Sequence, residues 1–312
     1  MRKFSTLACL LGLALKAWGQ IGENREWTSS DGRTIEAELV SVSENKVEVR
    51  KGGKLVSITL DMLSQADRDF ALGILTEQKK AAERADALEN GKHADAMKSE
   101  WIRYDADEGG LIYQLFVGKR VKKDDSIPLF VHLHGAGARA EDVKVGHVEI
   151  AAKTVASEEF YRSGKNQCVI CVPLCPPEPE TWPKQVAKLE ALIDNLIATL
   201  PVDTSRIYLS GYSQGGQGIG KLLQSRPDFY AGAIFADGGP ADNWIGKVKT
   251  PMWSYFSPER DSSKAEAQKE KFAANGVEYR FDVFPDSVHN NIHWKMAKSE
   301  EVFEWLFEQK KS

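Results

Sequence analysis

The spacing of hydrophobic and polar residues changes along the chain, and this change divides the chain into parts. In the first part, apolar and polar residues alternate at a period of two, which is typical of half-buried β-strands. The pattern predicts short strands at residues 25–28, 35–40, 46–50 and 55–60. Asp31-Gly32, Glu44-Asn45 and Gly52-Gly53 separate them and are typical of tight turns. We therefore expect a small SH3-like β-barrel over residues 20–76.

Its last element is a predicted helix from Ser64 to Leu75, which the Ser64 hydroxyl can cap. Residues 77–100 are rich in Ala, Lys, Glu and Asp and contain few large apolar side chains. This composition predicts a charged helical linker, which Asn90-Gly91 interrupts.

Residues 101–312 show a different pattern, in which continuously apolar runs alternate with amphipathic stretches. Strands are predicted at residues 111–117, 128–133, 168–172, 206–210, 231–236, 251–256 and 278–284. Helices are predicted at residues 142–158, 185–199 and 295–309. Strands that are apolar throughout are buried on both faces, so the fold class is α/β, with a doubly wound and mostly parallel sheet.

A G-x-S-x-G motif, Gly211-Tyr212-Ser213-Gln214-Gly215, follows the strand at residues 206–210. The glycine-rich run after it ends as a predicted helix. A serine on such a tight strand-to-helix turn exposes its hydroxyl, and the flanking glycines let the neighbouring segments approach. Ser213 is the candidate nucleophile.

The strand at residues 128–133 runs into a second glycine-containing turn, His134-Gly135-Ala136-Gly137. In hydrolases with a nucleophile elbow, one N–H after an early strand and the N–H after the serine bind the oxyanion. Here the candidate donors are Gln214 and Ala136, or Gly137 in place of Ala136.

From about residue 101 to the end, the chain resembles the α/β-hydrolase superfamily. Within it, the chain is similar to the secreted esterases grouped with polyhydroxybutyrate depolymerases, feruloyl esterases and phospholipase/carboxylesterases. The resemblance is carried by Leu133-His134-Gly135-Ala136-Gly137, Cys175-Pro176-Pro177 with Trp182, the block from Ser205 to Gly216, and the C-terminal His region. Residues 20–76 resemble the Sla homology domain. The resemblance implies a triad in the chain order Ser, acid, His.

The acid is the least determined member of this triad. Similar enzymes carry a His-Gly pair after the strand that corresponds to residues 251–256, with the acid three residues beyond the Gly, whereas this chain has Phe256-Ser257. Counting three residues onward reaches Arg260, which cannot serve. One inserted residue makes Asp261 the preferred acid. The alternatives are Glu259 first, then Asp237 and Asp286.

The base must be a histidine that exchanges a proton with the serine near neutral pH. Only His289 and His293 follow Ser213 in the chain. His289 comes after a predicted strand and is preferred, and His293 is the alternative. Trp182, on the proline-rich loop 173–183, is expected to line the substrate pocket with Tyr212 and His134.

These residues predict a serine esterase that acts on polysaccharide-linked acyl esters or on a polyester. A serine peptidase of the α/β-hydrolase type and a catalytically impaired binding protein are the alternatives. No metal or cofactor is expected. The net charge of −4 argues against nucleic acid as a partner, while the N-terminal domain could dock an unknown partner.

Residues 1–19 have the pattern of a cleaved signal peptide, with Arg2-Lys3, an apolar stretch, and Ala17 and Gly19 at the cleavage site. We therefore expect export to the periplasm or the extracellular space, without a membrane span. Three cysteines remain after cleavage, and this odd number argues against a fold built on disulfides. Burial as small hydrophobic side chains is expected, with a link from Cys175 to another cysteine as the alternative.

Overall fold

The computed structural model describes residues 20–98, 101–118, 121, 126–136 and 168–311. The chain divides into two compact units between Lys92 and His93, and each is described by itself. Among the described residues, no helix is both long enough and apolar enough to cross a membrane.

The N-terminal unit begins with four antiparallel strands. They are β1 (Asn24–Thr28), β2 (Thr34–Val42), β3 (Lys46–Lys51) and β4 (Lys54–Thr59), paired in that order. Alternation places Trp27, Leu39 and Val49 in one buried cluster. The strands occur where the period-two pattern predicts them.

The predicted closed barrel is not formed, because β1 and β4 are the two edges of the sheet among the described residues. The apolar face has another cover. After the short helix η1 (Leu60–Met62), the helix α2 (Gln65–Asn90) places Ala71 and Ile74 in the same buried cluster as Trp27 and Leu39. With a helix over its apolar face, a four-stranded sheet need not curl onto itself.

Helix α2 is longer than the sequence analysis predicts. Ser64 caps it as expected, and its hydroxyl accepts a hydrogen bond from the Asp67 N–H. The helix then continues through Leu75 into the predicted linker and ends at Asn90, where the Asn90-Gly91 pair predicts an interruption. Ala, Glu, Lys and Arg are strong helix formers and no proline intervenes, so nothing in the sequence stops the helix earlier.

The C-terminal unit contains an eight-stranded sheet in the order β12-β11-β10-β9-β7-β8-β6-β5. Its strands are β5 (Ile102–Tyr104), β6 (Tyr113–Val117), β7 (Ile127–Leu133), β8 (Val169–Pro173), β9 (Val202–Tyr212), β10 (Gly232–Ala236), β11 (Met252–Phe256) and β12 (Tyr279–Val283). From β12 to β8 all neighbours are parallel, while β5 and β6 are antiparallel to their neighbours. The predicted mostly parallel sheet is confirmed.

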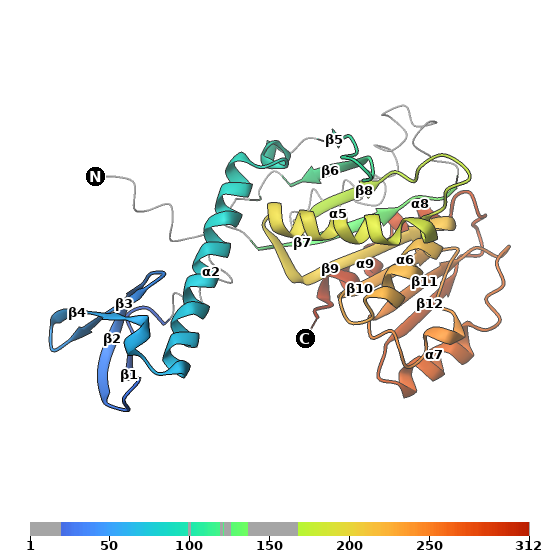
Figure 1. The fold of residues 1–312 in the computed structure, drawn as a ribbon. Helices are drawn as coiled ribbons and strands as arrows, with labels where there is room; N and C mark the ends of the chain where they lie inside the picture. The colour runs from blue at the N-terminus through green and yellow to red at the C-terminus, as the bar shows by residue number, and fades with distance from the viewer. Residues whose placement is uncertain (1–19, 99–100, 119–120, 122–125, 137–167, 312) are drawn as a thin grey trace. The chain divides into compact units, whose positions relative to one another are not determined.

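Helices cover both faces of this sheet (Figure 1). Helices α5 (Val186–Thr199), α6 (Gln214–Ser225) and α7 (Ala265–Ala274) contribute to one buried cluster, and α8 (Ile292–Ala297) and α9 (Glu300–Glu308) contribute to the other. Successive side chains of a strand point to opposite faces of the sheet and therefore belong to different buried clusters. Cys171 lies in the first and Cys168 in the second, and both are buried free thiols, as expected.

Two predicted helices of the C-terminal unit have other outcomes. The predicted helix at residues 295–309 is divided into α8 and α9, because Ser299 starts a new helix by accepting a hydrogen bond from the Val302 N–H. The predicted helix at residues 142–158 lies outside the described residues.

The first turn of α6 packs directly on the end of β7. A Cβ atom added to Gly215 would lie 1.9 Å from the carbonyl oxygen of Leu133, which is backbone and cannot move aside. The next glycine, Gly216, has more room, since its added Cβ would lie 3.5 Å from the Phe235 ring. Only a residue without a side chain fits at position 215.

We therefore expect Gly215→Ala to lower the free energy of unfolding of the C-terminal unit by about 3 kcal/mol, because the clash forces α6 away from β7. Gly216→Ala is the matched control, and we expect it to stay within about 1 kcal/mol of the parent. Urea unfolding followed by circular dichroism measures both. Equal effects of the two alanines would contradict the close approach of Gly215 to β7.

Candidate active site

Ser213 lies at the turn between β9 and α6, with φ 53° and ψ −113°. Among the described residues, Ser213 and Asp237 (φ 50°) are the two non-glycine residues with positive φ. Such backbone costs free energy and persists only where the surroundings enforce it. Positive φ marks the strained strand-to-helix turn that the motif predicts for Ser213.

A chain of hydrogen bonds joins Ser213, His289 and Asp237. His289 Nδ1 lies 2.6 Å from Asp237 Oδ2, and His289 Nε2 lies 3.0 Å from Ser213 Oγ. The carboxylate can only accept, so Nδ1 carries the proton and the unprotonated Nε2 accepts from the serine hydroxyl. Ser213 and Asp237 directly follow β9 and β10, and His289 lies in the loop between β12 and α8.

The Asp237 carboxylate is fully buried, with no exposed side-chain surface. Besides His289, it accepts hydrogen bonds from the Ser257 N–H at 2.6 Å and the Ser257 hydroxyl at 2.8 Å. Buried charge is tolerated when it is paired and hydrogen-bonded in this way. These bonds fix the direction in which Asp237 faces His289.

The structure does not bring Asp261, the acid preferred from the sequence, to His289. Asp261 is exposed, and a hydrogen bond from the Ser263 side chain, and next one from the Ser263 N–H at 2.9 Å, hold the pKa of Asp261 below its usual value. Glu259 bonds to the backbone N–H of His289 at 2.8 Å and not to the ring. Asp286 is also exposed, and no contact joins it to His289 within the described part of the chain.

The carboxylate that contacts His289 follows a different strand from the one on which the sequence prediction was based. That prediction counted residues after β11, whereas Asp237 directly follows β10, which pairs with β9, the strand that ends before Ser213. The order Ser, acid, His still holds. The available signal was the apolar run of β10 ending in Asp237-Gly238-Gly239, because carboxyl ends of parallel strands meet at one edge of a sheet.

Arg260 packs against the His289 ring. One guanidinium nitrogen lies 3.4 Å from Nδ1 and 3.3 Å from Nε2. Both ring nitrogens already have partners in the plane of the ring, so the guanidinium lies on its face. Arg260 Nε also lies 3.9 Å from Asp237 Oδ2, and 45% of its side chain is exposed. A cation therefore stands beside the Ser213 hydroxyl.

Tyr212 also contacts His289. It is not among the lining residues of the cavity described below, where the sequence placed it. Its hydroxyl donates a hydrogen bond to the His289 carbonyl at 2.8 Å. Burial, and next the nearby Asp237 charge, raise the pKa of Tyr212, so the hydroxyl keeps its proton. His293, the alternative base, packs on the Tyr212 ring with centroids 4.4 Å apart, and no described contact joins it to Ser213.

The candidate oxyanion donors lie on either side of Ser213. Gln214 opens α6, where the first N–H groups have no intrahelical acceptor and the helix dipole favours negative charge. A Cβ added to Gly135 would lie 3.7 Å from Ser213 Cβ, which brings the turn with Ala136 next to the nucleophile. Gly137 lies outside the described residues.

His134 and Trp182 hold this turn in place, and neither is among the lining residues of the cavity described below, where the sequence placed them. His134 Nε2 accepts from the Cys175 N–H at 3.1 Å, so Nδ1 is protonated and donates to the Gly135 carbonyl at 2.7 Å. Trp182, in the short helix η3 (Trp182–Gln185), is fully buried and donates its ring N–H to the His134 carbonyl at 2.8 Å.

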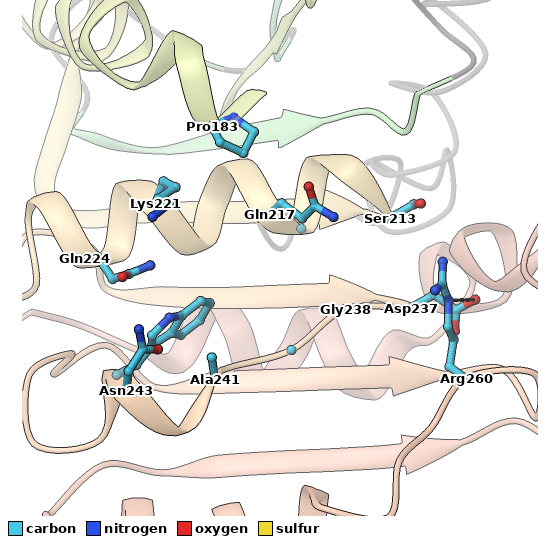
Figure 2. Close-up of a pocket in the computed structure, with 13 residues that line it drawn as sticks. Pro183, Ser213, Gln217, Lys221, Gln224, Asp237, Gly238, Ala241, Asn243 and Arg260 are labelled. Carbon is cyan, nitrogen blue, oxygen red and sulfur yellow. Dashed lines mark ion pairs between the residues drawn. The ribbon is translucent and has the colours of Figure 1, made fainter. Parts of the chain in front are cut away.

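A cavity of about 480 Å³ opens at Ser213 and follows α6 (Figure 2). Its lining consists of Pro183, Ser213, Gly216, Gln217, Lys221, Gln224, Asp237, Gly238, Gly239, Ala241, Asn243, Trp244 and Arg260. Pro183 is the part of the proline-rich loop that lines it. The described residues contain no cluster of three or more His, Cys, Asp or Glu side chains that could hold a metal ion.

Comparison with known proteins finds no matching family model and no matching curated protein. Solved structures do match. A thermostable esterase is 25% identical, with a TM-score of 0.59 over 69% of this chain, and this chain spans 64% of its length. A Bacteroides ovatus protein provisionally named dipeptidyl aminopeptidase IV is 10% identical, with a TM-score of 0.52 over 92% of this chain and 43% of its own. Est1E from Butyrivibrio proteoclasticus is 14% identical, with a TM-score of 0.47 over 67% of this chain and 97% of its own.

The C-terminal unit therefore has an α/β-hydrolase fold of the kind found in esterases. The mixed sheet with helices on both faces agrees with this assignment.

Buried histidines beneath the site predict a pH dependence of stability. Burial, and next the nearby His134 and His293, lower the pKa of His132 to about 3, and burial lowers that of His293 to about 4. The unfolded chain takes up these protons near pH 6.5, so unfolding becomes easier as pH falls below about 6.5.

Between about pH 6 and pH 4, the unfolded chain holds one proton on His132 that the folded chain lacks. His132→Gln should therefore make the slope of unfolding free energy against pH shallower by about 1.4 kcal/mol per pH unit. Urea titrations of parent and variant over this range measure the slope. An unchanged slope would show that His132 takes up its proton in the folded protein.

Proposed function

We propose that the C-terminal unit is a serine esterase in which Ser213 is the nucleophile, His289 the general base and Asp237 the acid. One observation carries the proposal: the hydrogen-bond chain from Ser213 Oγ to His289 Nε2 at 3.0 Å and from His289 Nδ1 to Asp237 at 2.6 Å. These distances suit proton transfer in a nucleophile, base and acid triad.

In the first half of the reaction, Ser213 Oγ attacks the carbonyl carbon of the ester while His289 Nε2 takes the hydroxyl proton. The resulting imidazolium is stabilised by the Asp237 carboxylate, which stays ionised. When the bond to the alcohol breaks, His289 returns the proton to the leaving oxygen. The product of this half is an acyl group on Ser213.

In the second half, a water molecule replaces the alcohol. His289 removes a proton from the water, which attacks the acyl carbon, and the proton then returns to Ser213 Oγ as the acid product leaves. In both halves, the N–H groups of Gln214 and Ala136 are the proposed donors to the oxyanion. The positive end of α6 favours the same charge.

The contact between Asp237 and His289 argues against the alternative of a catalytically impaired hydrolase-fold binding protein. That hypothesis was motivated by the altered loop after β11, which lacks a fitting acid. Because Asp237 contacts His289 from the end of β10, the altered loop no longer argues against catalysis. Polysaccharide-linked acyl esters and polyesters remain the proposed substrates, with peptide bonds as the alternative.

The remaining proposals concern the N-terminal part. The pattern of residues 1–19 supports cleavage of a signal peptide and export to the periplasm or the extracellular space. We propose that the N-terminal unit, which resembles a Sla homology domain in sequence, docks a partner and takes no part in the chemistry.

Ser213 should be the residue that becomes acylated. A fluorophosphonate probe followed by peptide mass spectrometry should therefore modify Ser213, and Ser213→Ala should abolish labelling. The same variant should lose several powers of ten in kcat on p-nitrophenyl esters, with its circular dichroism spectrum preserved. Labelling of another residue in the folded parent would sink the proposal.

The two candidate acids can be separated with matched substitutions. Asp237→Asn keeps the shape of the side chain but favours the wrong tautomer of His289. We therefore expect kcat to fall about 10⁴-fold, as it does when the triad aspartate of a chymotrypsin-like serine protease is replaced by asparagine. Asp261→Asn removes an exposed charge that bonds only within its own loop, and activity should stay within about twofold of the parent. Kinetics on a p-nitrophenyl ester test both. The reverse ranking would return the acid to the loop after β11.

A further inference from the structure

Three charged side chains line the cavity at Ser213: Lys221, Arg260 and Asp237. The Asp237 carboxylate is fully buried and bonded to His289 and Ser257, so its charge is already balanced inside the protein. The two charges that remain exposed to a ligand are both positive. The other polar lining side chains away from Ser213 are the neutral amides of Gln217, Gln224 and Asn243.

Lys221 stands on the same face of α6 as two of these amides. Gln217, Lys221 and Gln224 are separated by four and three residues, the spacing that aligns side chains along one face of a helix. Figure 2 shows them following Ser213 along the cavity, with Asn243 on the opposite wall. Lys221 follows Ser213 by eight positions, which corresponds to a rise of about 12 Å along the helix axis between the two backbone positions.

No ion pair or hydrogen bond joins the Lys221 side chain to any described residue. Helix α6 contains no Asp or Glu, so Lys221 has no acidic neighbour one turn away on its own helix. Several other lysines of the chain are paired. Lys269, for example, lies 3.7 Å from Glu266 on α7. An unpaired lysine that lines a cavity leading to the nucleophile is available to a ligand.

We propose that this site selects esters that carry an anionic group, and that Lys221, about two helical turns beyond Ser213, binds that group. The inference builds on the proposed esterase function and names its substrate class. Lysine is a point charge and does not require the two-pronged geometry of a carboxylate, so carboxylate and phosphate groups both fit. Arg260, at the nucleophile end of the cavity, attracts the same anion during approach.

Matched probes test the selection. The first pair is the p-nitrophenyl half-ester of sebacic acid and its primary amide, which differ in charge and hardly in shape. The corresponding adipic acid pair is too short to reach Lys221. Acetate esters of ω-hydroxydecanoic acid and of its amide place the anion on the alcohol side. For each pair, the quantity measured is the ratio of kcat/KM for the anionic ester to that for the neutral ester.

We expect a ratio of about two to five for a long-chain pair in the parent, because an exposed charge pair contributes a factor of this size. The adipate pair should show a smaller ratio, and added salt should lower the long-chain ratio. Lys221→Gln should bring it close to one, and Lys221→Glu should invert the preference. Lys188→Gln, the same change at an exposed lysine of α5 outside the cavity lining, is the control and should leave it unchanged.

Ratios near one for all pairs in the parent would overturn the inference and leave the esterase proposal standing. A preference that survives in Lys221→Gln would also overturn it, because another group would then bind the anion. If the parent hydrolyses none of the esters faster than Ser213→Ala does, the esterase proposal fails and this inference fails with it. An acetate ester of a long-chain alcohol that carries a phosphate group at its other end, tested in the same way, distinguishes a preference for phosphate from one for carboxylate.

Discussion

The contact between the first turn of α6 and the end of β7 is the constraint on which the site depends. Because Gly215 has no side chain, the helix can begin directly against the Leu133 carbonyl. This position brings the start of α6, the turn at Gly135 and the Ser213 hydroxyl to one edge of the sheet. His134 and Trp182 then fix the turn from below through hydrogen bonds that involve no surface residue.

Backbone strain occurs where the proposed chemistry needs it. Ser213 and Asp237 adopt positive φ angles at the ends of the neighbouring strands β9 and β10, and both side chains contact His289. The bonds from Ser257 fix the Asp237 carboxylate, and the bond from Tyr212 to the His289 carbonyl fixes the backbone of His289. Residues outside the cavity therefore keep the Ser213, His289 and Asp237 side chains aligned, as preorganised catalysis requires.

The features of the fold that depend on the local pattern of residues could be predicted from the sequence. Apolar periodicity located the described strands of the parallel sheet, and G-x-S-x-G located the turn at Ser213. The candidate acid was harder to choose, because Asp237 and Asp261 both follow apolar strands, so the signal at the end of β10 does not by itself favour Asp237, and the contact with His289 depends on where each strand end lies in the folded sheet. The position of Trp182 on a proline-rich loop also predicted a pocket residue. In the structure Trp182 is buried, because Gly218 of α6 packs closely against it, and this contact is not visible in the sequence. The open N-terminal sheet likewise depends on a helix that supplies its cover.

The position of Asp237 at the end of β10 has a consequence for how this protein can diverge. The carboxylate lies at the end of β10 and is held by Ser257 at the start of the loop after β11, while the following Glu259 and Arg260 contact His289 from the surface. Mutations there can alter the charge presented to a substrate while the carboxylate stays in place. The proposed anion site on α6 and the surface positions of this loop are thus separate from the buried Asp237, so the substrate preference that we propose can change by a single substitution at either place without moving the carboxylate.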